Sequence, residues 1–367
     1  MNIPFNILKP LYETLQDEMN TAVQRVLASG WYILGPEVEA FEQAFAEYHG
    51  LPYAVGVANG TDAIELALRA CGIGAGDEVI TLSHTAFATV NAVERAGATP
   101  VMVDIDPVTY TISPAAVEAA ITPRTKAIVP VHIYGQPADL DALQVLCERH
   151  HLLLIEDCAQ AHGARYRGRL VGTFGAVASF SFYPTKNLGA FGDGGAVITR
   201  DPQIAAKLKS LRNYGQTAKY HHEEWGMNSR LDEMQAAILG VKLVHLDSHN
   251  ATRQALASVY DRGLSNVTIP VIGANAQSVY HLYVVRHPQR DALMSALKNK
   301  GIGTAIHYPI PNHVQPACAH LGYSAGSLPA TEQAAREILS LPLYIGLSPS
   351  EVEEVCAVIS HEAGLLV

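Results

Sequence analysis

The feature that most constrains this chain is a rhythm repeated between residues 50 and 200, where a short β-branched run is followed by turn residues and then by a stretch of helical periodicity. Strands that alternate with helices predict a mainly parallel sheet with helices on both faces. Ligands of such α/β sheets bind at the carboxyl ends of the strands, so chemistry is expected in the residues that follow each strand. The expected strands are 53–58, 78–82, 100–104, 127–133, 152–156, 177–182 and 196–199, and the expected helices include 62–71, 89–96 and 140–150.

The pattern changes after Arg230, where one long helical stretch is expected over 231–249. The remainder predicts a strand at 280–286 and helices near 290–300 and 331–339, which is typical of a smaller α+β domain. A chain of 367 residues exceeds the size at which one hydrophobic core usually keeps growing. We therefore expect a large domain over 1–240 and a small domain over 241–367, in fixed contact because no flexible linker separates them.

Composition excludes several classes of function. A net charge of −10 argues against non-specific nucleic-acid binding, which needs clustered Lys and Arg. The first residues show no leader pattern and no apolar run approaches the length of a membrane span, so we expect a cytoplasmic protein without a membrane partner. The five cysteines lack CxxC spacing, and histidine pairs such as His150-His151 and His221-His222 are adjacent instead of four apart. Neither a disulfide framework nor a metal site is expected.

The first motif with possible chemistry is Asn59-Gly60-Thr61-Asp62, between the first strand and the first helix. Free backbone amides at a helix N-terminus, with glycine allowing close approach and threonine adding a hydroxyl, suit a phosphate. Taken alone, the motif is better explained as a helix cap with a turn glycine.

The second motif is the apolar strand 152–156, which ends in Glu156 and Asp157 at the edge where ligands bind. A carboxylate there could pair with a cationic ring nitrogen and keep it protonated, so that the ring serves as an electron sink, and Asp157 is the candidate. The alternative is that Asp157 caps a following helix while Glu156 faces solvent. In isolation the two interpretations are equally supported.

The third motif places Lys186 in a glycine-rich loop that follows the strand 177–182. A lysine desolvated there favours the neutral amine, which can form a Schiff base with a carbonyl group. Most single loop lysines are surface charges. The combination of phosphate cup, ring-nitrogen acid and lysine, each following a predicted strand, indicates one site at one edge of the sheet.

These motifs resemble the DegT/StrS sugar aminotransferases, which are pyridoxal-phosphate (PLP) enzymes of fold type I, and the similarity runs nearly end to end. The resemblance is carried by SGWYILGPEVEAFE (29–42), NGTDAIELAL (59–68), IEDCAQAHGA (155–164), SFSFYPTKNLGAFGDGGAV (179–197), NSRLDEMQAAIL (228–239) and HYPIPNH (307–313). It implies that Lys186 is the catalytic lysine that holds PLP, that Asp157 pairs with the ring nitrogen and that Gln160 lies beside the ring. It also implies that Gly60, Thr61 and Ser181 bind the phosphate.

The resemblance further implies a homodimer with its active site at the interface, where Asn228 reaches the cofactor of the neighbouring subunit. Family members often carry an aromatic residue that stacks on the ring where this chain has Ala86, with Phe87 one position later, which leaves the stacking residue open. Lys186 argues against the branch of the family in which histidine replaces the lysine and dehydration replaces amino transfer.

The expected reaction moves an amino group from L-glutamate to a nucleotide-linked ketosugar. The form of the lysine loop resembles enzymes that aminate C3 of a dTDP-linked 3-keto-6-deoxyhexose, and amination at C4 of a 4-ketosugar is the alternative. Lys219 and Arg230 are candidates for binding the nucleotide diphosphate, and Tyr183, His307 and Tyr308 for contacting the sugar. Each has a competing explanation. Lys219 is explained equally well as an ordinary surface charge, and the two tyrosines as rigid packing residues beside prolines.

Three rival functions would each need a feature of its own. A PLP lyase or cysteine desulfurase would need a reactive loop cysteine, for which Cys318 is the only distal candidate. A PLP-binding regulator without turnover would carry a basic helix-turn-helix segment, which the sequence lacks. A nicotinamide-binding module would need GxGxxG after the first strand, and Asn59-Gly60-Thr61-Asp62 does not supply it.

Overall fold

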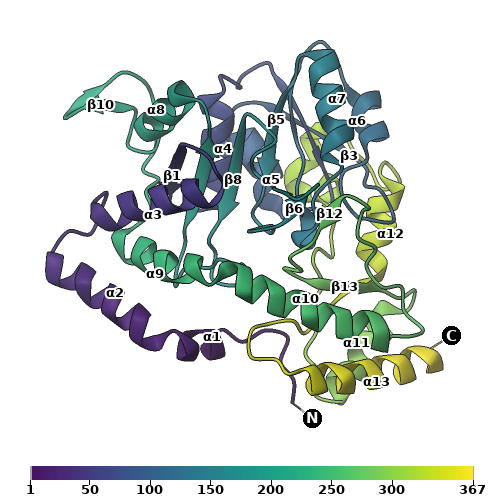
Figure 1. Cartoon of the computed structure of the whole chain (residues 1–367). Helices are drawn as coiled ribbons and strands as arrows, with labels where there is room; N and C mark the ends of the chain where they lie inside the picture. The colour runs from purple at the N-terminus through teal and green to yellow at the C-terminus, as the bar shows by residue number, and fades with distance from the viewer. Residues whose placement is uncertain (1, 367) are drawn as a thin grey trace.

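A seven-stranded sheet forms the centre of the N-terminal part of the protein in the computed structural model, which describes residues 2–366 (Figure 1). Its strand order is β1-β9-β8-β5-β4-β2-β3, and every strand except β9 runs parallel to the others. The expectation of a mainly parallel sheet is confirmed. The strands are β1 Tyr53–Val57, β2 Glu78–Leu82, β3 Thr99–Val103, β4 Thr125–Val129, β5 Leu153–Asp157, β8 Val177–Ser181 and β9 Gly195–Thr199.

Strand β9 lies between β1 and β8 and is antiparallel to both. Its first residue, Gly195, pairs with Ser181, the last residue of β8, so the start of β9 lies at the edge where the other strands end. The reason is the connection from β8 to β9, which contains no crossover helix and therefore returns the chain beside the strand it has just left.

Alternate side chains of the strands point to opposite faces, and each face carries its own apolar cluster. Val55, Val129 and Ile155 pack on one face, while Ile128 and Leu154 pack on the other. The first face is covered by α4 Gly60–Ala70, α5 Phe87–Arg95 and α8 Pro202–Leu211, and the second by α3 Pro36–Tyr48, α6 Pro114–Ala120, α7 Leu140–His150 and α9 Glu233–Val244. Burial on both faces explains the nearly continuous apolar character of the strands.

The prediction of one long helix over 231–249 is wrong in one respect, because the chain forms two helices that meet at His245. The first, α9, packs on α3 and α2, and the second, α10 Leu246–Gly263, runs on beneath the sheet to the C-terminal elements (Figure 1). Residues of α9 belong to the core beneath the sheet, whereas Leu256, Ala257 and Tyr260 of α10 belong to a separate apolar cluster.

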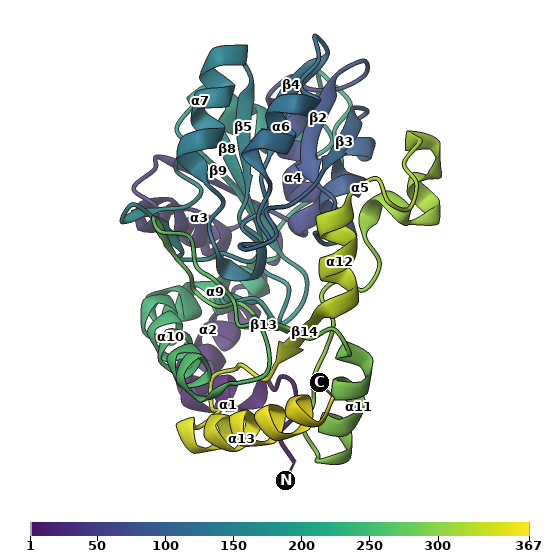
Figure 2. The ribbon, with the colours of Figure 1, turned by 90° about the vertical axis from the view of Figure 1, so that its right-hand side faces the viewer.

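That separate cluster lies among α10, α11 Arg290–Asn299 and α13 Pro349–Leu365, beside the antiparallel strands β13 Tyr283–Arg286 and β14 Ile338–Leu341 (Figure 2). The helix expected over 331–339 is α12 Pro329–Glu337, and it ends earlier because the chain from Ile338 pairs with β13 as a strand. The C-terminal part thus combines helices with an antiparallel pair of strands, as an α+β domain does. The domain boundary near residue 240 stays a prediction.

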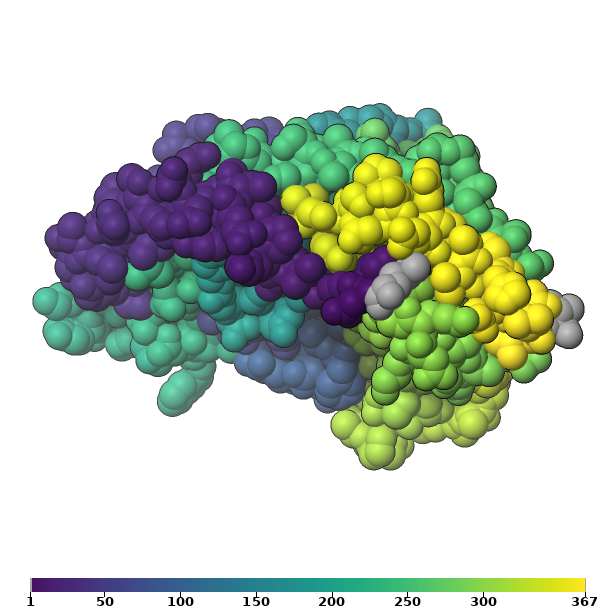
Figure 3. Space-filling view, turned by 90° about the horizontal axis from the view of Figure 1, so that it is seen from below, coloured from purple at the N-terminus to yellow at the C-terminus, as the bar shows by residue number. Residues whose placement is uncertain are grey.

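The N-terminal segment lies beside the C-terminal cluster. Ile3 forms a bridge with Ile302, and α1 Lys9–Thr14 brings Pro10 against Gly346. Seen from below, the N-terminal helices, including α2 Gln16–Ser29, adjoin the C-terminal region (Figure 3). Shorter strands are β6 Arg165–Tyr166, β7 Arg169–Leu170, β10 Gln216–Ala218, β11 His221–His222 and β12 Ala276–Gln277. Within residues 2–366 no helix combines the length and the apolar character that crossing a membrane requires.

Candidate active site

One pocket gathers the residues that follow β1, β5 and β8. Of the residues predicted to bind cofactor or substrate, seven line it: Gly60, Thr61, Asp157, Gln160, Ser181, Tyr183 and Lys186. The parallel direction of these three strands brings their carboxyl ends to one edge, as the alternating pattern predicts. The rest of the lining comes from Asn59, Ile64, Thr85, Ala86, Ala88, Thr89, Val131, Ala159 and Asp193.

The first turn of α4 forms one end of the pocket. Asn59 caps the helix by accepting a hydrogen bond from the Asp62 N–H at 2.9 Å. The amides of Gly60 and Thr61 belong to the first turn and have no preceding helical carbonyl to bind. Gly60 also lies against Ser181, since a Cβ at Gly60 would come within 2.6 Å of the Ser181 Cβ. Both the cap and an anion cup are therefore present, and a phosphate suits the cup.

Asp157 lies at the end of β5 with only 2% of its surface exposed. Its carboxylate accepts hydrogen bonds from Thr89 Oγ1 at 2.9 Å and from the Ala159 N–H at 3.1 Å. Burial raises the pKa of Asp157, while these two donors and the nearby Lys186 act to lower it. A buried carboxylate in this position is stabilised as an anion by a cationic partner, such as a protonated ring nitrogen.

Glu156 points away from the pocket. It is fully buried, which rules out the alternative in which Glu156 faces solvent. Its carboxylate accepts N–H groups of Gly172 at 2.7 Å and of Phe174 and Gly175 at 2.8 Å, and it bonds to His132 at 3.1 Å. Because neighbouring residues of a strand face opposite sides, the two acids have different surroundings: Glu156 binds the backbone of the 172–175 loop and Asp157 lines the pocket.

Lys186 follows β8 by five residues and is half-buried in the pocket. Burial lowers the pKa of its amine to about 8, and the negative charge of Asp157 acts in the opposite direction. Its backbone N–H donates to the Tyr183 carbonyl at 2.8 Å, which holds the loop in a tight turn. A lysine with a lowered pKa is more often neutral near physiological pH, as a nucleophilic amine must be.

Gln160 connects the pocket to Tyr308. Its Oε1 accepts the Tyr134 N–H at 2.7 Å, and its Nε2 donates to the Tyr308 hydroxyl at 2.9 Å. The Tyr134 hydroxyl donates in turn to the His307 carbonyl. Burial raises the pKa of Tyr308 to about 12, with a further contribution from Asp157. His307 and Tyr308 therefore lie next to the pocket, although neither is among its lining residues.

The remaining predicted residues lie outside the pocket of this subunit. Asn228 and Lys219 are exposed, and Arg230 is half-buried and donates to Asn213. Ser229, next to Asn228, donates to Asp62 at 2.8 Å and so connects this segment to the first turn of α4. Asn228 itself forms an isolated backbone bridge with Asn213.

Sequence reasoning missed Thr89, which is the side-chain donor to Asp157, and it left the ring-stacking residue open. Phe87 is the first residue of α5 and is 41% exposed, while Ala86 and Ala88 on either side of it line the pocket. Phe87 is therefore outside the pocket lining, and the ring-stacking residue stays open. Helical spacing could have identified Thr89, since a residue in the first turn of a helix at the ligand edge points toward the site.

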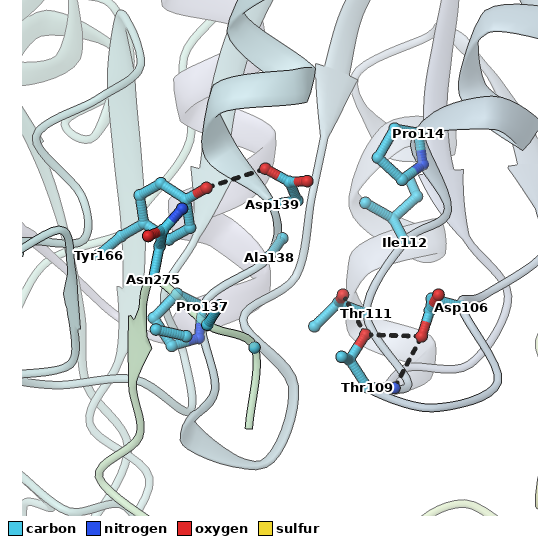
Figure 4. A pocket seen from close by; sticks show the side chains of 13 residues that line it. Asp106, Thr109, Thr111, Ile112, Pro114, Pro137, Ala138, Asp139, Tyr166 and Asn275 are labelled. Carbon is cyan, nitrogen blue, oxygen red and sulfur yellow. Dashed lines mark hydrogen bonds between the residues drawn. The ribbon is translucent and has the colours of Figure 1, made fainter. Parts of the chain in front are cut away.

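Two other groups of polar residues lie close together in the structure. A second cavity lies between the turn after β3 and the segment 273–276. Its side chains bond to one another, as Thr109 to Asp106 and Tyr166 to Asp139 do at 3.1 and 2.9 Å (Figure 4). Within residues 2–366, His132, Glu156 and Cys158 hold three possible metal ligands within 4.8 Å of one another. The Glu156 oxygens there already accept hydrogen bonds.

Comparison with known proteins decides the family. The model described as the DegT/DnrJ/EryC1/StrS aminotransferase family matches residues 13–360. This chain belongs to that family. The resemblance inferred from the motifs is confirmed, and so is the fold class.

Close relatives of this DegT-family member extend over almost all of the chain. It is 54% identical over 344 residues to the dTDP-3-amino-3,4,6-trideoxy-alpha-D-glucose transaminase of Streptomyces venezuelae. This match covers 93% of this chain and 91% of that protein. It is 52% identical over 366 residues to the erythromycin biosynthesis sensory transduction protein EryC1 of Saccharopolyspora erythraea, covering 99% of this chain and 100% of that protein. The crystal structure of S. venezuelae DesV in complex with a ketimine intermediate matches with a TM-score of 0.97 and 52% identity, covering 99% and 98% of the two chains.

The chain is therefore a PLP-dependent sugar aminotransferase, and solved structures of similar proteins hold the cofactor as PLP and as pyridoxamine phosphate. The pocket fits that group. A Cβ at Gly60 would meet Ser181, so glycine keeps that end of the pocket open for a phosphate, where Asp157 would provide a buried acid for the ring nitrogen and Lys186 the amine.

Proposed function

We propose that this enzyme transfers the amino group of L-glutamate to C3 of a dTDP-linked 3-keto-6-deoxyhexose. The observation that carries the proposal is the pocket that unites Lys186, Asp157 and the Gly60-Thr61 cup in a chain 54% identical to a named dTDP-3-amino sugar transaminase. The DesV structure supports the same reaction at the level of the fold. We also propose that the protein acts in the cytoplasm.

The chemistry of the site follows from its own residues. When bound, PLP supplies an electron sink for the carbanion formed at the amino acid Cα. Asp157 holds a negative charge at the ring nitrogen, with Thr89 and Ala159 keeping the carboxylate oriented. The Lys186 amine, with its pKa lowered to about 8, is suited to accept a proton from one carbon and return it to another. The same groups serve glutamate in one half-reaction and the ketosugar in the other.

The sugar contacts are proposed from their places beside the pocket. Tyr183 lines the opening with 54% of its surface exposed, so packing does not account for it. The Tyr308 hydroxyl accepts a hydrogen bond from Gln160 and keeps its own proton for an acceptor such as a sugar oxygen. His307 lies next to Tyr308, and burial lowers the pKa of its imidazole to about 4, with Lys186 adding to the effect. His307 is therefore neutral at physiological pH.

We propose a homodimer in which Asn228, Lys219 and Arg230 complete the site of the other subunit. Large apolar side chains are exposed on the segments near Asn228: Trp31 is 58%, Tyr220 84% and Trp225 92% exposed. Exposed aromatic side chains of this kind are typical of a surface that another chain covers.

The alternatives draw little support from the structure. Cys318 is 2% exposed in an apolar cluster with Val90 and Met102, and burial raises the pKa of its thiol, which disfavours a desulfurase. One assay tests the two remaining alternatives, which are amination at C4 and a PLP-binding regulator without turnover. The purified enzyme is given glutamate and a panel of nucleotide 3-ketosugars and 4-ketosugars, and amino sugar is identified by mass spectrometry and NMR. Product from the 4-ketosugars alone, or from none, overturns the proposal.

The shared site is tested by mixing subunits. Lys186→Ala and Asn228→Ala proteins should each be nearly inactive, because one lacks the amine and the other a phosphate contact. After unfolding and refolding together, half of the dimers should be mixed and each should contain one intact site, giving about a quarter of the wild-type activity. Mixtures no more active than the separate variants would contradict a site formed by two subunits.

A further inference from the structure

The residue that follows the catalytic lysine has a buried side chain with every polar atom engaged. Asn187 is 7% exposed. Its Nδ2 donates to Asn250 Oδ1 at 2.9 Å and to the Val279 carbonyl at 3.0 Å. Its Oδ1 lies 3.2 Å from His281 Nδ1, and since an amide oxygen only accepts, the proton must be on that imidazole nitrogen.

Asn250, which accepts a hydrogen bond from Asn187, also binds the segment that follows Gln160. It lies on α10 with 4% of its surface exposed, and its Nδ2 donates to the His162 carbonyl at 2.8 Å. His162 lies in a turn with Gly163, two residues after Gln160, which lines the pocket. The helix approaches this turn closely at Gly163, which has a φ of +84° and where a Cβ would come within 2.6 Å of Asn250 Nδ2.

Two amides therefore connect the loop of the lysine to the loop of the glutamine. The route runs from Asn187 through Asn250 to the backbone of His162, with hydrogen bonds of 2.9 and 2.8 Å. The route also passes through α10, whose later residues Leu256 and Tyr260 lie in the C-terminal apolar cluster. In a low-dielectric interior each of these bonds is costly to leave unmade, so the network holds its segments in one arrangement.

We propose that Asn187 and Asn250 are positioning residues that fix the Lys186 amine relative to Gln160 and to the C-terminal elements. This inference rests on the proposed role of Lys186 in holding PLP. Neither asparagine lines the pocket, so both act through the segments that they hold. A displaced lysine would still be present, but it would join the cofactor less completely, because the amine and the carbonyl carbon must meet in a narrow geometry.

The network predicts a defect that a loss of stability alone does not produce. Asn187→Ala removes three hydrogen bonds and Asn250→Ala removes two. Tyr260→Phe is a matched control on the same helix, because the buried Tyr260 hydroxyl donates to the Pro342 carbonyl at 2.8 Å, far along α10 from Asn250. All three variants lose buried hydrogen bonds, but only the asparagine variants loosen the lysine loop.

The experiment measures three quantities for each full-length variant: the urea midpoint, the PLP dissociation constant of the apoprotein, and the absorbance spectrum of the loaded protein. Both asparagine variants should bind PLP on the order of tenfold more weakly. A larger share of their bound PLP should absorb in the ultraviolet instead of the visible band that marks PLP joined to lysine. Tyr260→Phe should lose stability with a PLP dissociation constant within about twofold of wild type.

Two results would overturn the proposal: wild-type PLP affinity and spectrum in the asparagine variants, or an equal loss of affinity in Tyr260→Phe. If Asn187→Ala does not fold, Asn250→Ala decides, since it leaves both Lys186 and its neighbour unchanged. A wild-type protein that took up no PLP would instead refute the role proposed for Lys186, so the two failures are distinct.

Discussion

Thr89 gives the sharpest test of how the pocket controls Asp157. The Thr89 hydroxyl donates to the carboxylate at 2.9 Å, and Thr89→Val removes this donor while keeping the shape of the side chain. A hydrogen bond to a charged group contributes roughly 1.5–3 kcal/mol, and about 1.4 kcal/mol corresponds to one pKa unit. Burial already raises the pKa of Asp157, and losing a donor that lowers it should raise the pKa by about one to two further units.

The consequence appears in the pH dependence of cofactor binding. The ionised carboxylate is the form that pairs with a protonated ring nitrogen, so affinity falls as pH drops through the pKa of Asp157. In Thr89→Val this fall should begin about one to two pH units higher than in the wild type. Thr89→Ser, which restores the hydroxyl, should return the curve toward the wild-type position.

The assay is a fluorescence titration of each apoprotein with PLP, repeated at a series of pH values that descends from neutral until the affinity of the wild type falls. Its readout is the pH at which the dissociation constant begins to rise. If Thr89→Val and the wild type follow one curve, the hydroxyl does not control the charge of Asp157. A uniform loss of affinity at every pH would likewise refute the reasoning, since it would indicate altered packing.

Three further variants have definite expected outcomes. Lys186→Met should abolish turnover yet raise the stability of the apoprotein near pH 7 by about 1–3 kcal/mol, because burial lowers the pKa of the lysine and the folded state is penalised wherever the amine is charged. The gain in melting temperature should shrink as pH rises above about 8, and a gain independent of pH would be inconsistent with this cause. Glu156→Gln should destabilise the protein by roughly 3 kcal/mol in urea unfolding while leaving the PLP dissociation constant nearly unchanged, because two oxygens that accept N–H groups become one. Phe87→Ala should leave PLP affinity within about twofold, since the side chain lies outside the pocket, and a larger loss in the titration would place it on the ring after all.

Much of the sheet and the centre of the site could be predicted from the sequence. Parallel strands buried on both faces leave a strong apolar signal, and the rule that ligands bind at strand ends predicts that Gly60, Asp157 and Lys186 lie together. The structure shows the three in one pocket. The direction of β9 was missed, although the absence of a helix between β8 and β9 was a readable sign of an antiparallel return.

What could not be predicted depends on contacts between distant parts of the chain. In the sequence Glu156 looks like a polar residue at the end of a strand. Its burial is favourable only because the 172–175 loop donates N–H groups to its carboxylate. The strand at 338–341 depends on its pairing with β13, a tertiary contact that outweighs local helical periodicity. Asn187 and Asn250 are 63 positions apart, and no local pattern announces their hydrogen bond.

The position of β1 also shapes how the protein is made. This strand is synthesised early, yet it lies at the edge of the sheet and its partner there is β9, which ends at Thr199. The cup at Gly60 likewise needs Ser181 beside it. A growing chain therefore cannot close the sheet or form the cofactor pocket until about 200 residues have left the ribosome, and pairing over such a separation is slow. The nascent chain can therefore bind PLP only late in its synthesis. Until β9 has been made, the edge of β1 that will pair with it stays unpaired.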